Sequence, residues 1–560
     1  MRRLLLIALM GSSAAMAQVS GPLVSAPAEM AVSDSFAVIA SMGRANAFAV
    51  REIRVNRDHK MRKDADANRQ LARSALVSAS VAVPTGAPYA QTATYQPLGA
   101  PIGANFEALG VGTPGFGIAG APPDTTLGVS PTQIVQWVNT QIGIYDKAGN
   151  SLLPAPGFMN GNQVWQGLPA GSLCRQFNRG DPLVQYDRLA QRWILSQFAF
   201  NSTFTNNAQC IAVSTTSNAL GSYVLYEYNF GVLLPDYGKL GIWPDAYFIT
   251  YNMFNVGANT FNGGRACAYD RPAMIAGLAA NQICFNSTSR FSFLPSDLDG
   301  TTLPPAGAPN YHISWNWYTT AAPPYTIQLT KFAPDFITPG NSTFDDGFGG
   351  GAFSFVAFPM DASSGAACND GGSNFTCVSQ LGTAQRLDTL GDRHMYRLVY
   401  RNFGTHDALL FTQAIDEPGG AQNAQLRWWE IRQPGAAAPQ VYQNSTFKPT
   451  ADARWMGSAA FDKLGNIGIG YSVSSAAMNP SIRVAGRRKN DPKNILRAEV
   501  TVKAGTGSQT SGLERWGDYS TMQIDPADDC TFWYTQQYIA ANGSFNWNTR
   551  IASFKFPNCN

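Results

Sequence analysis

Short motifs of acidic, basic and aromatic residues recur along this sequence at points where a strand is expected to begin, and we call these motifs openings. They take the form Gly-Asp, Pro-Asp or Arg-Trp, and each precedes a short apolar or alternating run. If the openings lie at one mouth of a common channel, their side chains converge on a concave surface that could bind a polar organic ligand. The residues concerned are Asp124, Asp181, Asp245, Asp392, Asp518, Arg393, Arg454, Arg515, Trp455, Trp516 and Tyr519.

Carboxylates gathered in this way could cleave a glycosidic bond. In a glycoside hydrolase, Asp392 and Asp518 would act as acid and as base or nucleophile, and the arginines would hold an acidic sugar. In a polysaccharide lyase, Tyr519 or His394 would abstract a proton while an arginine offsets the carboxylate charge. A structural reading stands beside both, because Asp after Gly or Pro often accepts backbone N–H bonds in a turn. His394 also fits a hydrogen-bonded structural role.

The spacing of the openings predicts a repeat fold. A gap of 147 residues is about twice the others, and the stretch APNYHISWNWYTT supplies a further opening near Asn310. About seven units of roughly 60 residues result, each with room for about four strands. Such units repeated radially are typical of a β-propeller, so the sequence predicts an all-β fold with seven four-stranded blades; two stacked sandwiches are the alternative. The openings fall at residues 124, 181, 245, 392, 455 and 518.

The N-terminus predicts export. Arg2 and Arg3 precede the apolar run 4–10, and small residues follow up to Ala17, which is the pattern of a cleaved signal peptide. We therefore assign 1–17 to a signal peptide and expect a secreted protein, extracellular or periplasmic, without a membrane span.

Residues 18–115 differ in amino-acid composition from the rest of the chain. They are Ala/Ser/Val-rich and end in a Pro/Gly/Ala-rich stretch, so we expect a poorly ordered N-terminal arm, a possible pro-segment and linker. Residues 116–560 form the predicted propeller domain.

The composition argues against nucleic acid as a partner. Charged residues make up 14% of the chain and aromatic residues 12%, and the formal net charge is +3. Residues 124–560 carry a net charge of −1, so the main domain lacks the basic stripe that nucleic-acid binding needs. A glycan ligand and a monomeric state are expected.

Eight cysteines fit an oxidising compartment, and no Cys-x-x-Cys motif suggests a thiolate metal site. Connectivity cannot be deduced from spacing alone. Pairing of neighbours along the chain, which closes short loops, is the expected arrangement. The pairs would be Cys174–Cys210, Cys267–Cys284, Cys368–Cys377 and Cys530–Cys559.

No cofactor is expected, because the sequence has no HExxH pair, no Gly-x-Ser-x-Gly elbow, no Walker loop and no dinucleotide fingerprint. Two acidic turns resemble calcium-binding loops: the one with Asp297 and Asp299, and the one with Asp525, Asp528 and Asp529. Both also fit ordinary polar turns.

The combination of PPDTTLGVSPTQIVQWVNTQIGIYDKAGN, RWMGSAAFDKLGNIGIGYSVSS and ERWGDYSTMQIDPADDCTFWYTQQY resembles a family of secreted bacterial β-propeller-like proteins without assigned activity. The resemblance covers about residue 115 to the C-terminus and implies export and a propeller. Sialidase-like glycosidases are similar by architecture only, since the sequence has no clean Asp-box. We expect a secreted propeller that binds a carbohydrate at its channel mouth, as a glycoside hydrolase or polysaccharide lyase. The alternative is a non-catalytic extracellular adhesion or scaffold propeller.

Overall fold

The computed structural model confirms the predicted all-β fold. Helices are short: α1 (Phe36–Ser41), α3 (Leu173–Gln176), α4 (Arg271–Ile275) and the 3-10 turns η1 (Gly161–Trp165) and η3 (Pro339–Asn341). No helix among the described residues is long and apolar enough to cross a membrane. The signal peptide lies outside the described residues. These are 21–42, 79–80, 90–118, 120–288, 290–315, 325–345, 356–359, 365–368, 376–416, 423–436 and 439–560.

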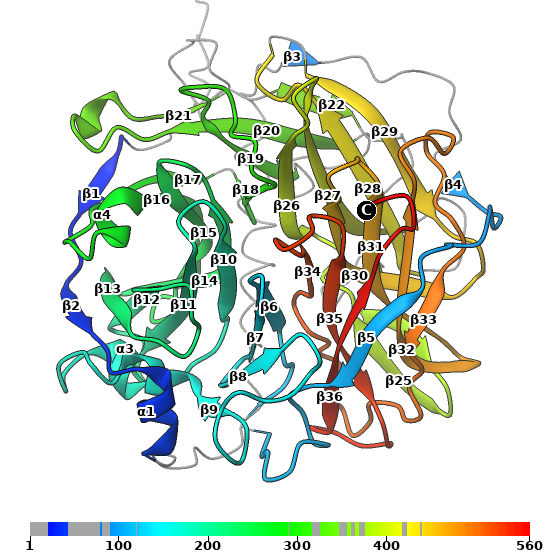
Figure 1. Cartoon of the computed structure of the whole chain (residues 1–560), viewed down its shortest axis with the longest axis horizontal. Coiled ribbons are helices and arrows are strands. Elements are labelled where there is room, and N and C mark those ends of the chain that lie inside the picture. The colour runs from blue at the N-terminus through cyan, green and yellow to red at the C-terminus, as the bar shows by residue number, and fades with distance from the viewer. Residues whose placement is uncertain are drawn as a thin grey trace, which may run out of the picture.

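One strand from each successive unit lies at the centre of the molecule, and we call these the inner strands. Each inner strand contacts the next along the chain, and the last contacts the first, so they surround a common axis (Figure 1). This is the radial arrangement typical of a β-propeller. The inner strands are β6 (Thr125–Val129), β10 (Leu183–Asp187), β14 (Leu233–Ile242), β18 (Leu294–Asp299), β26 (His394–Asn402), β30 (Ala453–Phe461) and β34 (Thr521–Ile524).

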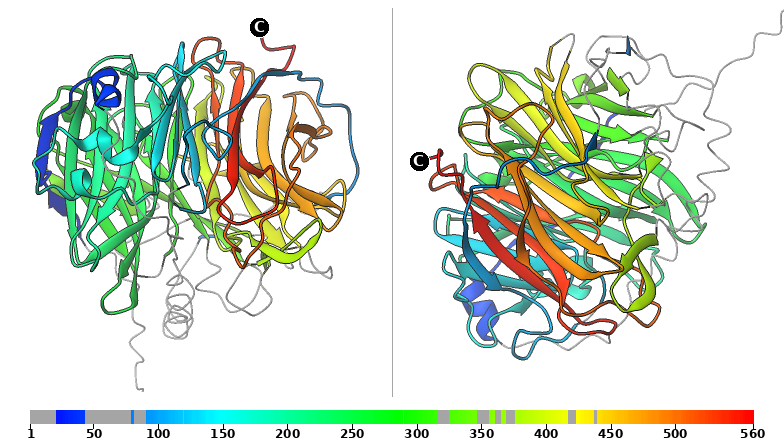
Figure 2. Two further views of the ribbon diagram at one scale, coloured as in Figure 1. Left: turned by 90° about the horizontal axis from the view of Figure 1, so that it is seen from below. Right: turned by 90° about the vertical axis from the view of Figure 1, so that its right-hand side faces the viewer.

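Further strands add outward from most inner strands in antiparallel order, and they run between two faces of the molecule (Figure 2). We call the face where the inner strands begin the entry face and the opposite one the exit face. The added strands are β7 (Gln133–Val138), β8 (Gln141–Asp146), β9 (Met159–Asn160), β11 (Arg192–Phe200), β12 (Asn207–Ser214), β13 (Tyr223–Gly231), β15 (Ala246–Asn255), β16 (Thr260–Asp270), β17 (Gln282–Ser287), β31 (Ile467–Ser475), β32 (Met478–Arg487), β33 (Val500–Lys503), β35 (Phe532–Ile539) and β36 (Trp547–Phe554).

The inner strands β18 and β26 belong to one twelve-stranded sheet, because they pair with each other in parallel, with Ser296 opposite Leu398 and Asp299 opposite Arg401. The strands on either side of this pair run outward as in the other sheets. They are β19 (Asn310–Trp315), β20 (Thr326–Ala333), β21 (Thr343–Asp345), β22 (Val356–Pro359), β23 (Gly365–Ala366), β27 (Asp407–Asp416), β28 (Gln425–Arg432) and β29 (Gln440–Phe447). A separate two-stranded sheet contains β24 (Thr376–Gln380) and β25 (Thr383–Asp388).

The N-terminal region contributes five strands to four sheets. β5 completes the last sheet by pairing with β36, where Phe106 lies opposite Ile551 and Glu107 opposite Arg550. These described parts of the N-terminal region are therefore attached to the other sheets by backbone pairing. The strands are β1 (Leu23–Ser25) on β17, β2 (Glu29–Val32) on β13, β3 (Ala79–Ser80) on β22, β4 (Ala90–Gln91) on β29 and β5 (Ile102–Glu107) on β36.

A residue with left-handed backbone conformation lies shortly before, or within the first half of, six of the inner strands. Asp and Ser tolerate this conformation better than bulky residues do, so tertiary packing must impose it on the others. The positive φ angles lie between 44° and 56° at Asp124, Asp181, Tyr237, Ser292, Leu390 and Met456.

Two predicted openings do not start an inner strand. Asp245 lies in the turn between β14 and β15, at the exit end of the inner strand. Asn310 begins β19, the second strand of its unit, because the inner strand is β18. The earlier Pro-Asp of the same stretch, Pro235-Asp236, lies in the first half of β14 next to the left-handed Tyr237, and the sequence analysis passed over it.

All four predicted disulfides are present, and the structure describes no free cysteine. Cys174 joins α3 to Cys210 of β12, and both side chains are fully buried. Cys267 and Cys284 lie opposite each other on β16 and β17. The disulfides therefore hold neighbouring elements of one unit together.

Candidate functional site

Three carboxylates meet at the entry face: Asp124, Asp181 and Asp518. The backbone N–H of Asp518 donates to Asp124 Oδ1 at 2.6 Å, and Asn139 Nδ2 donates to Asp124 Oδ2 at 3.0 Å. Asp181 Oδ2 accepts from the backbone N–H of Tyr237 at 3.1 Å. The three carboxyl groups also repel one another electrostatically. The structure thus brings Asp518 next to Asp124, 394 positions away along the chain.

Two cations lie among these carboxylates. Lys239 is fully buried, and its Nζ lies 3.3 Å from the ring centroid of Tyr237 and 4.2 Å from that of Tyr519. Arg515 forms an ion pair with Asp518, and its Nε lies 3.8 Å from Asp388 Oδ2. We call Asp124, Asp181, Asp518, Lys239 and Arg515 the entry cluster.

Burial shifts three pKa values in the entry cluster: it raises those of two carboxyl groups and lowers that of the lysine. It raises the pKa of Asp181 to about 6, although Lys239 opposes the shift. Burial raises the pKa of Asp124 well above its ordinary value, and repulsion from Asp518 and Asp181 adds to this. Burial also lowers the pKa of Lys239 to about 8 against the attraction of Asp181. Burial therefore favours the protonated form of both carboxyl groups and the neutral form of Lys239. Shifted pKa values among grouped ionisable residues are frequent at functional sites.

The raised pKa of Asp181 predicts a pH-dependent loss of stability. Between about pH 4 and pH 6 the folded state binds more protons at this group than the unfolded chain does, so stability falls as pH rises. In Asp181→Asn this decline is absent. We expect the Tm of the variant, relative to the unmodified protein, to rise from pH 4 to pH 6 and to level off above.

Asp146 provides the matched control for that measurement. Its pKa is lowered, first by a hydrogen bond from the Asn150 side chain, so its contribution to stability is present above its ordinary pKa and is lost as pH falls. Asp146→Asn should therefore change the pH profile of Tm in the opposite sense. Parallel Tm profiles for the two variants would contradict the assignment of the shift to burial of Asp181.

Asp392 and Arg393 lie beside the entry cluster, but they bind each other. Arg393 Nε and its terminal nitrogen lie 2.8 and 3.2 Å from the two oxygens of Asp392, and both residues are buried. The guanidinium also stacks over the rings of Tyr237, at 4.4 Å, and Phe291, at 4.9 Å. The Asp392–Arg393 pair therefore packs against the ring of Tyr237, whose backbone N–H donates to Asp181.

The two residues proposed for proton abstraction are buried. Tyr519 lies beside the entry cluster, but its hydroxyl donates to the carbonyl of Pro182 at 2.9 Å, and burial and three carboxylates raise its pKa well above the ordinary value. His394 packs against the rings of Trp315 and Phe411. Burial lowers the pKa of His394 to about 3, so this imidazole is neutral at ordinary pH.

Three other residues that were expected to line the channel mouth lie in the packed interior of the protein. Arg454 is fully buried and binds Glu499 with two nitrogens, at 2.8 and 3.0 Å. Trp455 and Trp516 stack on each other with ring centroids 5.7 Å apart, and Trp516 Nε1 donates to Ser472 Oγ. The expectation that these three line the mouth is wrong, because each side chain is fully buried and occupied by interior contacts.

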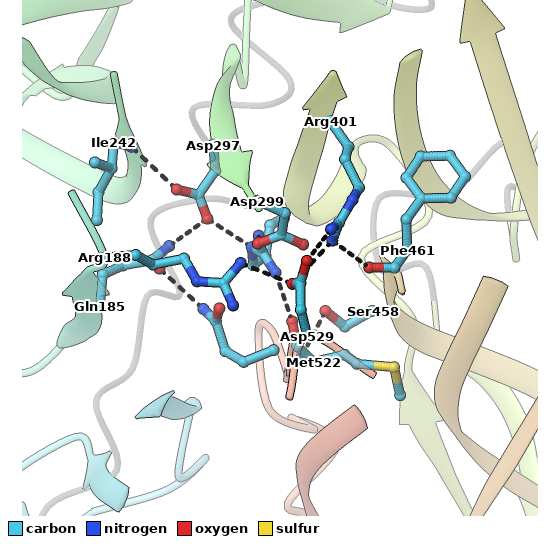
Figure 3. Close-up of polar contacts among 12 residues, drawn as sticks. Gln185, Arg188, Ile242, Asp297, Asp299, Arg401, Ser458, Phe461, Met522 and Asp529 are labelled. Atoms are coloured by element: carbon cyan, nitrogen blue, oxygen red, sulfur yellow. Dashed lines mark hydrogen bonds and ion pairs between the residues drawn. The ribbon is translucent and has the colours of Figure 1, made fainter. Parts of the chain in front are cut away.

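Below the entry cluster the channel is filled by a polar network (Figure 3). Arg397 Nε lies 2.6 Å from Asp297 Oδ2, and its two terminal nitrogens bind Asp299 and the carbonyl of Met522. Gln185 Nε2 also donates to Asp297 at 2.7 Å. Every one of these side chains is buried, so the network closes the centre of the molecule.

The two acidic turns that resemble calcium-binding loops are neutralised by cations. Asp297 and Asp299 bind Arg397, while Asp529 binds Arg188 and Arg401. Within the part of the chain that the structure describes, no group of three His, Cys, Asp or Glu residues is placed to hold a metal ion.

A small cavity lies at the exit end of the channel, lined in part by Asp187, Arg188, Asp299 and Gln523. Its volume is about 10 Å³, which is room for about one water molecule. A sugar does not fit there. The entry face is therefore the better candidate for binding a ligand of that size.

Three members of the site were not named by the sequence analysis: Tyr237, Lys239 and Asp388. The first two belong to LPDYGKLGIWPDAYF, which contains two Pro-Asp pairs. The spacing from Asp181 favours the first pair, since Tyr237 follows Asp181 by nearly the same interval as Asp181 follows Asp124. A stricter use of the period would have found them.

No protein-family model matches the chain, and no curated protein matches it. Among solved structures, the GH93 α-L-arabinofuranosidase of Fusarium graminearum in complex with arabinobiose is 8% identical over 82% of this chain and 99% of its own, with a TM-score of 0.36. The Penicillium chrysogenum α-L-arabinanase complexed with arabinobiose is 8% identical over 82% and 100%, with a TM-score of 0.37. The polysaccharide lyase PL25, an ulvan lyase, is 9% identical over 80% and 97%, with a TM-score of 0.36. Likenesses this remote carry no argument about mechanism.

Proposed function

We propose that the protein is a secreted, monomeric β-propeller of seven blades that binds a carbohydrate at its entry face and cleaves it. Two observations support the blade number. The ring of inner strands has one member per unit, and the twelve-stranded sheet divides into two outward halves at the parallel β18–β26 pair. Four disulfides and the signal-like N-terminus support secretion.

The observation that carries the proposed activity is the grouping of three carboxyl groups in the entry cluster, where the backbone of Asp518 donates to Asp124 and burial raises the pKa values of Asp124 and Asp181. Asp124, whose pKa burial raises well above its ordinary value, would be the general acid toward the leaving-group oxygen. Asp181 or Asp518 would be the base or nucleophile. Asp392, the earlier choice for one of these roles, is held by Arg393 and fits a positioning role better.

Asp181 and Asp518 are the members of this set with access to solvent. Asp181 is partly exposed, the Asp518 side chain is 12% exposed, and its partner Arg515 is 17% exposed. A ligand at the entry face would therefore meet these side chains first, with Asp124 and Lys239 beneath them. Lys239 would hold Asp181 in its ionised form through attraction of opposite charges.

Product release from a polysaccharide panel tests the proposal. The panel should contain arabinan, xylan, polygalacturonate and its methyl ester. Asp124→Asn, Asp181→Asn and Asp518→Asn should each lower product release about 10²–10⁴-fold, which is the usual contribution of a general acid or base. The matched control is Asp245→Asn, because Asp245 follows a Pro in the same way but lies at the exit end of its strand.

Retained glycan binding without product release, unchanged by all four substitutions, would contradict catalysis and favour the non-catalytic adhesion or scaffold propeller. One observation already favours that alternative: Asp124 and Asp181 both accept backbone N–H bonds, as turn-forming carboxylates do. The substitution series separates the two, because a purely structural Asp would lower Tm without a specific effect on turnover.

A further inference from the structure

A group of basic side chains lies on the exit face, far from the entry cluster along the inner strands. We call it the basic patch and define it by Arg432, Lys463, Lys489 and Lys493. Arg432 ends β28, Lys463 follows β30, and the other two lie in the segment after β32. That segment, residues 486–497, carries five basic residues and one acidic residue.

Packing holds the lysines of the basic patch together. The backbone N–H of Lys489 donates to Asn466 Oδ1 at 2.9 Å, which fixes Lys489 to the turn that carries Lys463. Lys493 and Arg432 share one aromatic ring: their charged ends lie 3.7 and 3.3 Å from the ring centroid of Tyr442. Cation–π attraction to one ring holds two like charges close to each other.

The lysines of the patch differ from lysines elsewhere on the surface. Within the described residues, Lys147, Lys503 and Lys555 each form an ion pair with a carboxylate. In contrast, the exposed Lys463, Lys489 and Lys493 form none among those residues.

The carboxylates near the basic patch already bind other side chains, and most of them are buried. Glu430 binds Arg432 at 2.6 Å and is 2% exposed, and Asp491 binds Arg497 through both oxygens. Asp462 is fully buried and binds Asn466. The surface is therefore left with an excess of positive charge, which attracts anions.

We propose that the basic patch binds an acidic polysaccharide through its carboxylate or sulfate groups. Single-stranded nucleic acid fits less well, because it stacks bases on free aromatic rings, whereas Tyr442 is covered by cations. Duplex DNA needs a wider basic surface than this near-neutral domain offers. A lipid surface fits less well too, since Leu464 is the one large hydrophobic residue of the patch segments that is markedly exposed.

Binding of matched polymers at increasing salt concentration tests the patch. Dextran sulfate and polygalacturonate should bind, and uncharged dextran should not. The two acidic polymers distinguish sulfate from carboxylate recognition. The triple variant Lys463→Gln, Lys489→Gln, Lys493→Gln should bind the acidic polymers about tenfold more weakly and with a shallower salt dependence, because fewer counterions are displaced.

The control removes the same charge elsewhere: Lys147→Gln, Lys503→Gln, Lys555→Gln should keep the affinity within about twofold, because these lysines are already paired. Equal weakening in both triple variants would overturn the proposal, as would unchanged binding in the first. Tighter binding of duplex DNA or of phosphatidylserine vesicles than of both acidic polymers would also overturn it. Asp181→Asn should leave this binding intact, which separates it from the proposed activity at the entry face.

Discussion

Replacing Arg397 with methionine will lower the free energy of unfolding by about 3–5 kcal/mol, the range for breaking a buried ion pair from one side. Arg397 is buried and binds Asp297, Asp299 and the carbonyl of Met522. Methionine fills much of the volume but leaves two buried carboxylates without their cation. Denaturant unfolding followed by tryptophan fluorescence measures the loss.

The pH dependence of that loss identifies its electrostatic origin. Burial already raises the pKa of Asp297, and Arg397 opposes the shift, so removing Arg397 raises this pKa further. A carboxyl whose folded pKa lies above its unfolded value destabilises the fold increasingly as pH rises. The effect of Arg397→Met should therefore be larger at pH 7 than at pH 4.

Two further variants control for simple loss of packing. Adding Asp297→Asn to Arg397→Met should recover part of the stability, because one unpaired charge is removed. Lys503→Met, which breaks a partly exposed pair with Glu107, should cost at most about 1 kcal/mol. A loss that is independent of pH and unaffected by Asp297→Asn would contradict the electrostatic explanation.

Removing the Cys174–Cys210 disulfide with paired serine substitutions should cost about 4 kcal/mol. The bond closes a loop with a sequence separation of 36 residues, and the loop-entropy model gives a larger loss for a longer loop. Two buried hydroxyl groups in place of the sulfurs add a desolvation cost. Thermal and denaturant unfolding in the absence of reductant measure the effect.

Cys267–Cys284 is the matched comparison. Its sequence separation is 17, and its two residues already lie opposite each other in the β16–β17 ladder. The same model gives about 3 kcal/mol for its removal. The order of the two losses is the critical result: a greater loss for Cys267–Cys284 would contradict an effect set by loop length.

The largest error of the sequence analysis concerned Asp245, and its cause is physical. The feature that recurs before or within the first half of six inner strands is a left-handed backbone conformation, not a residue type. Asp124 and Asp181 adopt it with a side chain that tolerates it, whereas Tyr237 and Met456 are held in it by packing. A search for Asp alone therefore selected the wrong Pro-Asp of two.

The sequence by itself determined the all-β fold, because turn residues and alternation are local properties. It left the cysteine pairing open, and the structure confirms the expected pairing of neighbours along the chain. Only the tertiary structure decided which side chains reach the entry face. Arg454 lies inside β30 and turns toward Glu499, whereas Arg515 precedes β34 and reaches Asp518, although both stand in an Arg-Trp pair. Side chains alternate between the two faces of a strand, so the same dipeptide at a different position relative to the strand faces a different environment.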